Sequence, residues 1–314
     1  MIITVVIPCY NVARHIKDVI GNIPDSISYI IAVNDCSKDD TESILLKMAN
    51  ENKKIIYIRH EVNQGVGGAM ISGYKRSMEL NADITIKMDG DGQMDPAYIP
   101  ALIKPLMEDK ADFTKGNRFR DLNALRKMPL IRRFGNLGLS FMIKAASGYW
   151  NIFDPNNGFI AIKSETLNYL DLNKIHKRYF FESSMLIRLY RINAVVQDIP
   201  MKARYGDEKS GLSIARTLFE FPFKLFIAFL KRIILKYFLY DFNVASIYLL
   251  VGSPLFLFGI YYGVTNFLKY SRNHIGAPTG TVVIPTLLII LGFQLLLSAV
   301  TYDITNYPKK NNGA

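Results

Sequence analysis

The stretch Ile84-Thr-Ile-Lys-Met-Asp-Gly-Asp-Gly-Gln-Met-Asp-Pro96 carries the clearest chemical pattern in this chain. A short apolar run ends at two aspartates, Asp89 and Asp91, and a glycine follows each of them. Because alternate side chains of a strand share a face, this spacing predicts two carboxylates aimed at one point. Two such anions repel unless a cation lies between them, and hard oxygen ligands suit Mg²⁺ or Mn²⁺. An ordinary Asp-Gly turn after a buried strand would contain the same residues, so the flanking sequence has to distinguish a cation site from a turn.

Strands and helices alternate on the N-terminal side of this stretch. Apolar, β-branched runs predict strands at 2–7, 29–33, 55–58 and 84–88, and helical patterns lie between them at about 13–23, 37–49 and 69–79. This alternation predicts βαβ units and an α/β fold with a mostly parallel sheet. Ligands of such sheets bind outside the carboxyl ends of the strands. The polar clusters that follow each strand are therefore expected to converge on one cleft; they are residues 8–11, 34–37, 63–68 and 89–91.

Two other signals in this half of the chain have ordinary explanations. The glycine cluster Gly65-Val-Gly-Gly-Ala-Met70 departs from the dinucleotide-binding pattern at its sixth position, and it follows the third strand instead of the first. A nicotinamide enzyme is therefore disfavoured. Cys9 and Cys36 are too few for a disulfide framework and have no zinc-ligand spacing, so we expect reduced, small apolar residues.

The C-terminal third is apolar and basic. Residues 244–268 and 275–302 contain no charged side chain, and each run exceeds the roughly 20 residues that cross a hydrocarbon core. They predict a two-helix transmembrane hairpin. Residues 213–242 mix Phe and Leu with recurring Lys and Arg, which predicts amphipathic helices in the membrane interface with a bend at Pro222. The net charge of +11 therefore indicates anionic lipid, with no nucleic acid partner.

The distribution of basic residues predicts a topology and a division into domains. Basic residues flank the hairpin mainly before its first span and after its second, which places both termini and the preceding domain in the cytoplasm, at a bacterial inner membrane. A homo-oligomer is possible, because spans of this kind often associate. The expected segments are a catalytic domain at 1–211, juxtamembrane helices at 212–242, a hairpin at 243–303 with spans near 244–268 and 278–302, and a tail at 304–314.

Four motifs, in this order, carry a resemblance to a known family. They are Val5-Val-Ile-Pro-Cys-Tyr-Asn11, Val33-Asn-Asp-Cys-Ser-Lys-Asp-Asp-Thr41, Asn63-Gln-Gly65 and Asp89-Gly-Asp-Gly-Gln93. Residues 1–215 resemble the family 2 glycosyltransferases of the Rossmann-like GT-A fold. Within that family the chain is most similar to the polyprenyl-phosphate glycosyltransferases, the group that contains dolichyl-phosphate mannose synthase.

The resemblance implies a binding site for a nucleoside-diphosphate sugar. Asp35 would accept a hydrogen bond from the base, Asp89 would approach the ribose or the sugar, and Asp91, with Asp89 beside it, would hold Mg²⁺ or Mn²⁺ on the diphosphate. The family usually has a second acidic residue where this chain has Asn34, which leaves the base open. The complete implied donor site is Pro8, Tyr10, Asn11, Asp35, Gly65, Asp89, Gly90, Asp91, Gln93, Arg204, Lys209 and Ser210.

The same resemblance implies an acceptor site. Arg118 would face a phosphate, and Asp154 would lie beside the acceptor and the sugar, in the motif Phe153-Asp-Pro-Asn-Asn-Gly-Phe159 that also contains Asn157. A basic patch of Arg126, Arg132 and Arg133 could meet a second phosphate or simply be a solvated surface. Glu182 could serve this site or could favour the positive end of its own helix.

The resemblance implies an enzyme that transfers a sugar, with inversion, from a nucleoside diphosphate to a polyprenyl phosphate such as undecaprenyl or dolichyl phosphate. A UDP-sugar is favoured by analogy, and GDP-mannose is possible. A phosphate monoester has a second pKa near 6, so Asp154 is expected to position the acceptor instead of removing a proton.

Two alternatives stay open from the sequence. A glycosyltransferase that acts on a glycan hydroxyl would need a base, either Asp154 or Glu182. The processive enzymes of this kind carry a Q-x-x-R-W motif. The single tryptophan of this chain, Trp150, lies in Gly-Tyr-Trp-Asn instead, which disfavours a processive enzyme. A non-catalytic membrane scaffold of the same fold is the other alternative, although the intact carboxylates disfavour it.

Overall fold

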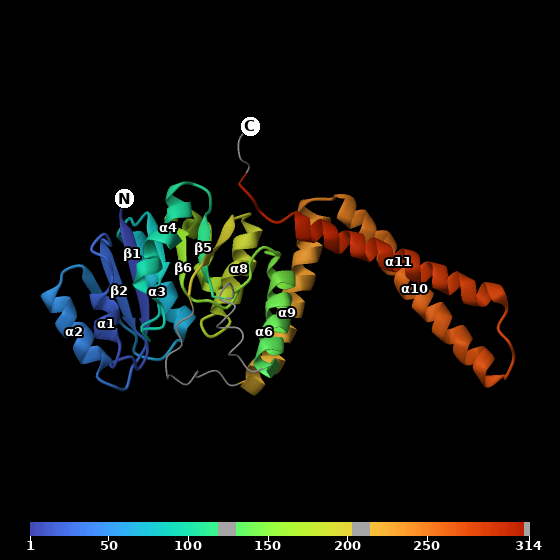
Figure 1. The fold of residues 1–314 in the computed structure, drawn as a ribbon, viewed down its shortest axis with the longest axis horizontal. Coiled ribbons are helices and arrows are strands. Elements are labelled where there is room, and N and C mark those ends of the chain that lie inside the picture. The colour runs from blue at the N-terminus through green and yellow to red at the C-terminus, as the bar shows by residue number, and fades with distance from the viewer. Residues whose placement is uncertain (119–129, 203–213, 311–314) are drawn as a thin grey trace. The chain divides into compact units, whose positions relative to one another are not determined.

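The computed structural model describes residues 1–118, 130–202 and 214–310, and Figure 1 shows the order of their elements. The chain divides into two compact units. One consists of Met1–Ala228 with Pro308–Ala314, and the other is Phe229–Tyr307.

Within the described part of the first unit, seven strands form one sheet in the order β3-β2-β1-β4-β6-β5-β7. The strands are β1 (Ile3–Cys9), β2 (Tyr29–Asn34), β3 (Ile55–Arg59), β4 (Ile84–Lys87), β5 (Phe113–Asn117), β6 (Ile160–Lys163) and β7 (Val196–Pro200). β6 lies antiparallel between β4 and β5, whereas the other pairings are parallel. The predicted α/β class with a mostly parallel sheet is confirmed.

The helices of this unit divide between the two faces of the sheet because side chains alternate along each strand. Val5 and Ile7 of β1 share a buried core with residues of α1 and α4. On the opposite face Thr4 Oγ1 lies 2.5 Å from Ser77 Oγ of α3. The helical elements are α1 (Ile16–Gly21), α2 (Thr41–Glu51), α3 (Val66–Glu79), η1 (Pro96–Tyr98), α4 (Ile99–Met107), α6 (Leu130–Ser147), α7 (Ser164–Asn168), η2 (Leu172–Lys174), α8 (Phe181–Arg191) and α9 (Ile214–Ile234).

The first helix is shorter than the sequence predicted. A helix from residue 13 was expected, but α1 begins at Ile16. The backbone nitrogens of Val12 and Ala13 donate instead to Thr41 Oγ1 at 2.9 Å and to Asp39 Oδ2 at 3.0 Å. These bonds join the segment after β1 to the start of α2 and fix residues 12 and 13 in the connection before the helix.

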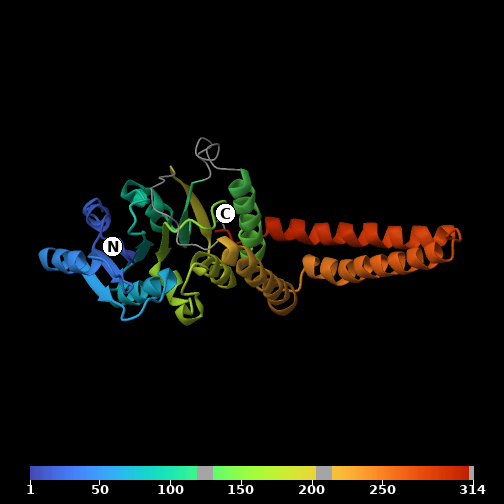
Figure 2. The ribbon, with the colours of Figure 1, turned by 90° about the horizontal axis from the view of Figure 1, so that it is seen from below.

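The second unit contains the end of α9, a π-helical turn η3 (Leu235–Tyr240), and two long helices, α10 (Val244–Arg272) and α11 (Thr279–Thr305). Both long helices are long and apolar enough to cross a membrane, and only 22% and 17% of their most apolar windows are buried. A core helix of a soluble protein would be mostly buried. The two helices run side by side (Figures 1 and 2), and a Cβ on Gly292 would lie 2.5 Å from the backbone nitrogen of Phe256.

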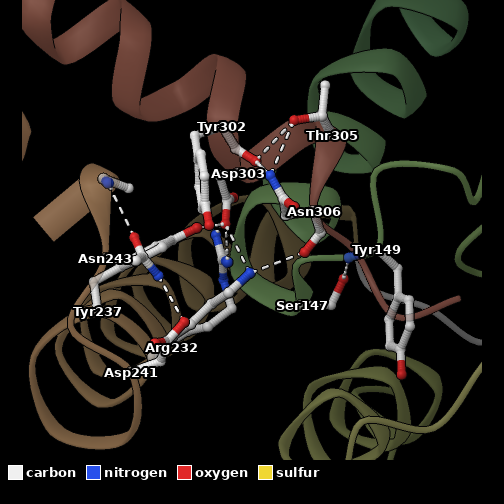
Figure 3. A network of polar contacts seen from close by, with 12 residues as sticks. Ser147, Tyr149, Arg232, Tyr237, Asp241, Asn243, Tyr302, Asp303, Thr305 and Asn306 are labelled. Atoms are coloured by element: carbon white, nitrogen blue, oxygen red, sulfur yellow. Dashed lines mark hydrogen bonds and ion pairs between the residues drawn. The ribbon is translucent and has the colours of Figure 1, made fainter.

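Buried polar side chains join the end of α9 and η3 to the end of α11. Arg232 and Asp303, each with 5% of its side chain exposed, form a two-pronged ion pair with both N–O distances at 2.7 Å. The Tyr237 hydroxyl donates to Asp303 Oδ1 at 2.5 Å, and Lys236 Nζ lies 3.6 Å from the same oxygen. Figure 3 shows Arg232, Tyr237 and Asp303 pointing toward one another. A buried carboxylate is thereby neutralised and hydrogen-bonded, as burial requires.

Candidate active site

The carboxyl end of β4 places a buried lysine beside the first aspartate of the D-x-D pair. Lys87 and Asp89 are two residues apart, so their side chains share a face. Lys87 Nζ donates to Asp89 Oδ1 at 2.6 Å and to the carbonyl of Gly158 at 3.2 Å, and it lies 3.5 Å from Glu182 Oε1 of α8. Only 1% of the lysine side chain is exposed, compared with 31% for Asp89. The ammonium group is therefore a fixed internal cation beneath Asp89.

A second buried lysine occupies the same row of the sheet. Ile160 of β6 pairs with Lys87 on one side and with Lys115 of β5 on the other. Lys115 Nζ donates to the carbonyl of Asn157, the residue before Gly158. The two lysines thus hold consecutive carbonyls of the loop that enters β6, and this loop lies at the same edge as the carboxyl ends of the parallel strands.

The two lysines differ in their electrostatic surroundings. Burial lowers the pKa of Lys115 to about 8. Burial acts in the same direction on Lys87, but the carboxylates of Asp89 and Glu182 outweigh it and raise the pKa of that lysine. Lys87 is therefore charged at neutral pH.

Arg118 follows β5 directly and forms an ion pair with Asp154. Arg118 Nε lies 2.8 Å from Asp154 Oδ2 and Nη2 lies 3.2 Å from Oδ1, while the backbone nitrogen of Arg118 also donates to Oδ2 at 3.2 Å. Asp154 is 1% exposed, but 37% of the Arg118 side chain remains exposed. The arginine is therefore anchored by the aspartate on one side and open to solvent on another. A role for Arg118 on phosphate stays a prediction.

The turn after β4 presents the second aspartate. Asp91 is partly exposed, and its Oδ1 accepts a hydrogen bond from the backbone nitrogen of Gln93 at 2.9 Å. Among the residues that the structure describes, no group of three His, Cys, Asp or Glu side chains is arranged to hold a metal ion. Two carboxylates, Asp89 and Asp91, nevertheless fit a cation that keeps several waters and takes its remaining ligands from substrate phosphates, as Mg²⁺ commonly does.

Asp35, at the end of β2, organises the glycine loop that begins at Asn63. Its Oδ1 accepts from the backbone nitrogen of Gln64 at 2.8 Å, and its Oδ2 accepts from that of Gly65 at 2.7 Å. His60 Nδ1 lies 2.7 Å from Oδ1, and its Nε2 lies 2.8 Å from Ser72 Oγ. Asp35 is 2% exposed, so this carboxylate mainly holds the loop together. Contact between Asp35 and a base stays a prediction.

The segment after β1 contacts the loop after β2. Asn11 has a φ of 55°, and its Oδ1 accepts from the backbone nitrogen of Lys38 at 2.8 Å. Its own backbone nitrogen donates to Ser37 Oγ at 3.0 Å. Tyr10 beside it is 47% exposed, and Pro8 pairs with Val33 within the sheet. The structure therefore brings the first two predicted clusters together at one edge.

Two more polar residues support the loop before β6. Asn157 is 3% exposed, and its Oδ1 accepts from the backbone nitrogen of Phe159 at 2.9 Å. Asp198 of β7 accepts from the backbone nitrogen of Phe153 at 2.7 Å and from Asn117 Nδ2 at 2.9 Å. Burial raises the pKa of Asp198 to about 6. Asn157 serves the loop internally, and its predicted contact with an acceptor phosphate is untested.

Some predicted site residues lie outside the part of the chain that the structure describes. Arg126, Arg204, Lys209 and Ser210 are among the residues omitted. Arg132 and Arg133 lie on α6, but their side chains are likewise not described.

Gly90, between the two aspartates, packs closely against the segment after β1: a Cβ at this position would lie 3.3 Å from Val12 Cγ2.

Sequence reasoning missed four side chains that hold the predicted site residues and their loops in place. They are Lys87, Lys115, His60 and Asp198. For Lys87 a signal was available, because a charged residue in an otherwise apolar strand, two positions before Asp89, must share its face. Nothing in the sequence pairs Lys115 with it, because that relation depends on the insertion of β6.

Comparison with known proteins supports the motif-based interpretation. The sequence model described as glycosyl transferase family 2 matches residues 4–170, which is more than half of the chain. The chain belongs to glycosyl transferase family 2. It is 35% identical over 219 residues to the UDP-N-acetylglucosamine–dolichyl-phosphate N-acetylglucosaminyltransferase of Methanococcus voltae, covering 66% of this chain and 87% of that protein.

Other members of family 2 share the same region. An undecaprenyl-phosphate mannosyltransferase from Micrococcus luteus is 26% identical over 204 residues, which cover 64% of this chain and 83% of the relative. The crystal structure of glucosyl-3-phosphoglycerate synthase from Mycobacterium tuberculosis with Mn²⁺ and UDP-glucose aligns with a TM-score of 0.54 and 18% identity, over 74% of this chain and 78% of that one. This likeness concerns the GT-A fold. The family 2 protein is therefore an enzyme, a glycosyltransferase, as the motifs predicted.

Proposed function

We propose that the protein transfers a sugar, with inversion at the anomeric carbon, from a nucleoside-diphosphate sugar to a polyprenyl phosphate. The observation that carries this proposal is the placement of the Asp89–Asp91 turn and the Arg118–Asp154 ion pair at one edge of the sheet, in a chain with two membrane-length apolar helices. The names of two relatives, which specify dolichyl phosphate and undecaprenyl phosphate, support the acceptor class.

The donor would bind along the carboxyl edge from β1 to β4. Tyr10 and Asn11 would approach the base and ribose, and Asp89 and Asp91 would lie near the diphosphate. A Mg²⁺ or Mn²⁺ ion held by these aspartates would supply positive charge to the departing diphosphate. The Methanococcus relative, whose name specifies a UDP-sugar, supports uridine as the base.

The acceptor would bind beside the Arg118–Asp154 pair. A phosphate monoester is mostly dianionic at neutral pH, so its oxygen needs orientation instead of deprotonation. Asp154 is neutralised by Arg118, and Glu182 lies near Lys87. Neither carboxylate is therefore well placed as the strong base that a hydroxyl acceptor would require. The exposed part of Arg118 would contact phosphate oxygens.

The membrane would present the lipid acceptor to this domain. On α9, Phe223 and Phe226 are 67% and 58% exposed, which suits a helix at the lipid interface. We propose that α10 and α11 span the membrane, with the catalytic domain and both termini in the cytoplasm, and that the domain boundaries lie near residues 211, 242 and 303. A polyprenyl phosphate suits this arrangement because its tail stays in lipid while its phosphate reaches the polar site.

A panel of nucleotide sugars would test the proposal. Purified full-length protein in detergent would receive each sugar with undecaprenyl or dolichyl phosphate, with and without Mn²⁺, and with a free glycan as the competing acceptor. We expect a polyprenyl-phosphate sugar with the opposite anomeric configuration to the donor, identified by mass spectrometry and NMR. Transfer to the glycan alone, or no donor turnover at all, would refute the proposal.

A further inference from the structure

One carboxylate oxygen of β7 joins the two chain segments that carry the Arg118–Asp154 ion pair. Asp198 Oδ2 accepts a hydrogen bond from the backbone nitrogen of Phe153 at 2.7 Å and another from Asn117 Nδ2 at 2.9 Å. Phe153 is the residue before Asp154, and Asn117 is the residue before Arg118. Each member of the ion pair is therefore one residue away from a bond to the same atom.

The sheet fixes the position of this oxygen. Asp198 is aligned with Lys115 in the parallel register of β7 and β5. Two residues before Asp198, the carbonyl of Val196 accepts from Asn151 Nδ2 at 3.0 Å, so the loop before β6 has a second bond to the same strand. Strands position polar groups more precisely than loops do. β7 can therefore set the distance between the two segments.

Stability does not explain the carboxylate of Asp198. Its Oδ1 is buried and has no hydrogen-bond partner among the residues that the structure describes. A buried polar atom without a partner costs free energy, and burial raises the pKa of this carboxyl to about 6 even though Lys115 lies nearby. The ionised side chain therefore lowers the stability of the fold at neutral pH. An unpaired buried group of this kind is typical of a residue that serves function.

We propose that Asp198 is a positioning residue that acts through the Arg118–Asp154 ion pair. Its Oδ2 sets the separation of the two segments and so keeps the guanidinium group against the buried carboxylate, in the orientation that leaves part of the arginine open to an acceptor phosphate. Asp198 itself is not expected to touch either substrate. The part that concerns the acceptor rests on the proposed function, whereas the effect on the ion pair rests on the hydrogen bonds alone.

The test is the Asp198→Asn variant of the full-length protein in detergent. The amide keeps the shape of the side chain but offers only a neutral acceptor, which binds N–H groups more weakly than a carboxylate does. In protein labelled with ¹⁵N-arginine, NMR follows the exchange of the Arg118 Nε–H with water, and Arg118→Lys identifies the resonance by its absence. We expect exchange about tenfold faster than in the wild type, because the ion pair opens more often. An unchanged exchange rate in the folded variant overturns the proposal.

Two further variants separate positioning from stability. Gln197→Ala, at an exposed position of the same strand, should leave exchange and turnover unchanged. The midpoint of thermal unfolding of Asp198→Asn at pH 7 should equal or exceed that of the wild type, because the variant no longer buries a charge. A lower midpoint with exchange as slow as in the wild type would show a purely structural role and overturn the proposal. If Asp198→Asn does not fold, Asn117→Ala removes one of the two bonds and keeps the carboxylate, and faster exchange is again expected.

Kinetics test the part that concerns the acceptor. With a donor and a polyprenyl phosphate that the wild type uses, Asp198→Asn should lower kcat about tenfold and raise the KM for the acceptor, while the KM for the donor stays unchanged. In an Asp154→Asn background the additional loss should be less than about twofold, because the pair through which Asp198 acts is already weakened. An equal rise in the donor KM, or fully additive losses, overturns this part. Because the exchange measurement needs neither sugar nor lipid, its result is independent of whether the proposed transfer reaction is found.

Discussion

Arg118 and Asp154 form an ion pair at the carboxyl edge of the sheet, with Arg118 Nε 2.8 Å from Asp154 Oδ2. The aspartate is almost fully buried, whereas more than a third of the arginine side chain remains exposed. The pair therefore presents a positive group to the site and keeps its carboxylate inside. This relation favours positioning over proton removal as the role of Asp154.

Asp154→Asn should retain measurable turnover, with kcat lowered by roughly 10- to 100-fold, because the amide keeps the shape of the carboxylate but weakens its hold on Arg118. The pH dependence of kcat should keep the wild-type form. Asp18→Asn, at an exposed position on α1, is the matched control. If the wild type shows a steep acid limb that Asp154→Asn abolishes, Asp154 is a base and the positioning account is wrong.

Asp91→Asn should reduce kcat by about 1,000-fold, since it removes the carboxylate that we expect to hold the divalent ion on the donor. A chelator should abolish wild-type turnover, and added Mn²⁺ or Mg²⁺ should restore it. The measurement is the initial rate of transfer against metal concentration. Full activity in the chelator would contradict any role for a divalent ion.

Gly158→Ala should lower both activity and stability. Its Cβ would lie 2.4 Å from Lys87 Nζ and 2.9 Å from Asp89 Oδ2, so it displaces an ammonium group that is buried and bonded to Asp89. We expect kcat to fall about tenfold or more and the midpoint of thermal unfolding to fall as well, because overpacking a buried site typically costs about 1 to 3 kcal/mol. Gly21→Ala is the control, because a Cβ there meets no atom within 4 Å. Equal loss of activity in both variants would contradict the prediction.

Asp303→Asn should destabilise the second unit. Removing one partner of a buried ion pair leaves the other charge uncompensated, at a typical cost of about 3 to 5 kcal/mol. Here Arg232, only 5% exposed, would keep at most one hydrogen bond to this side chain, through the amide oxygen, and its other nitrogen would face the amide NH2 group. Thermal unfolding and limited proteolysis in detergent would measure the effect.

A double-variant comparison isolates that interaction. Arg232→Met/Asp303→Leu removes both charges together, so it should recover much of the loss that either single variant shows. Purely additive losses would mean that the two side chains do not stabilise the unit as a pair.

The raised pKa of Asp198 predicts a pH dependence of stability. Burial raises this pKa to about 6, whereas an aspartate in the unfolded chain titrates near 4. Between these values the folded state binds the additional proton, so the free energy of unfolding falls as the pH rises through this window, by about 3 kcal/mol. Asp198→Asn cannot titrate and should lose this part of the slope. Thermal unfolding at pH 4.5 and pH 7 would measure it, and an identical slope in both proteins would refute the assignment.

Local patterns were sufficient for much of the architecture and for the family. Strand-ending polar clusters at Asn11, Asp35, Gly65 and Asp89 predicted which side chains share an edge, because parallel strands place their carboxyl ends together. Two apolar runs of membrane length predicted α10 and α11, because the length of an apolar run can be counted in the sequence itself. These inferences need only the period of a strand, the length of a span and the order of the motifs.

The supporting chemistry depends on contacts between distant segments. β6 inserts antiparallel between β4 and β5, and only this pairing aligns Lys87, Ile160 and Lys115 in one row. Arg118 and Asp154 meet across 36 residues of chain, and Arg232 and Asp303 across 71. Sequence spacing identified Asp89 and Asp91 as carboxylates that could face a ligand, because alternate side chains of a strand share a face. Tertiary structure decided which cations neutralise the buried aspartates, because a buried charge takes its partner from whichever strand or helix the fold brings within a few ångströms.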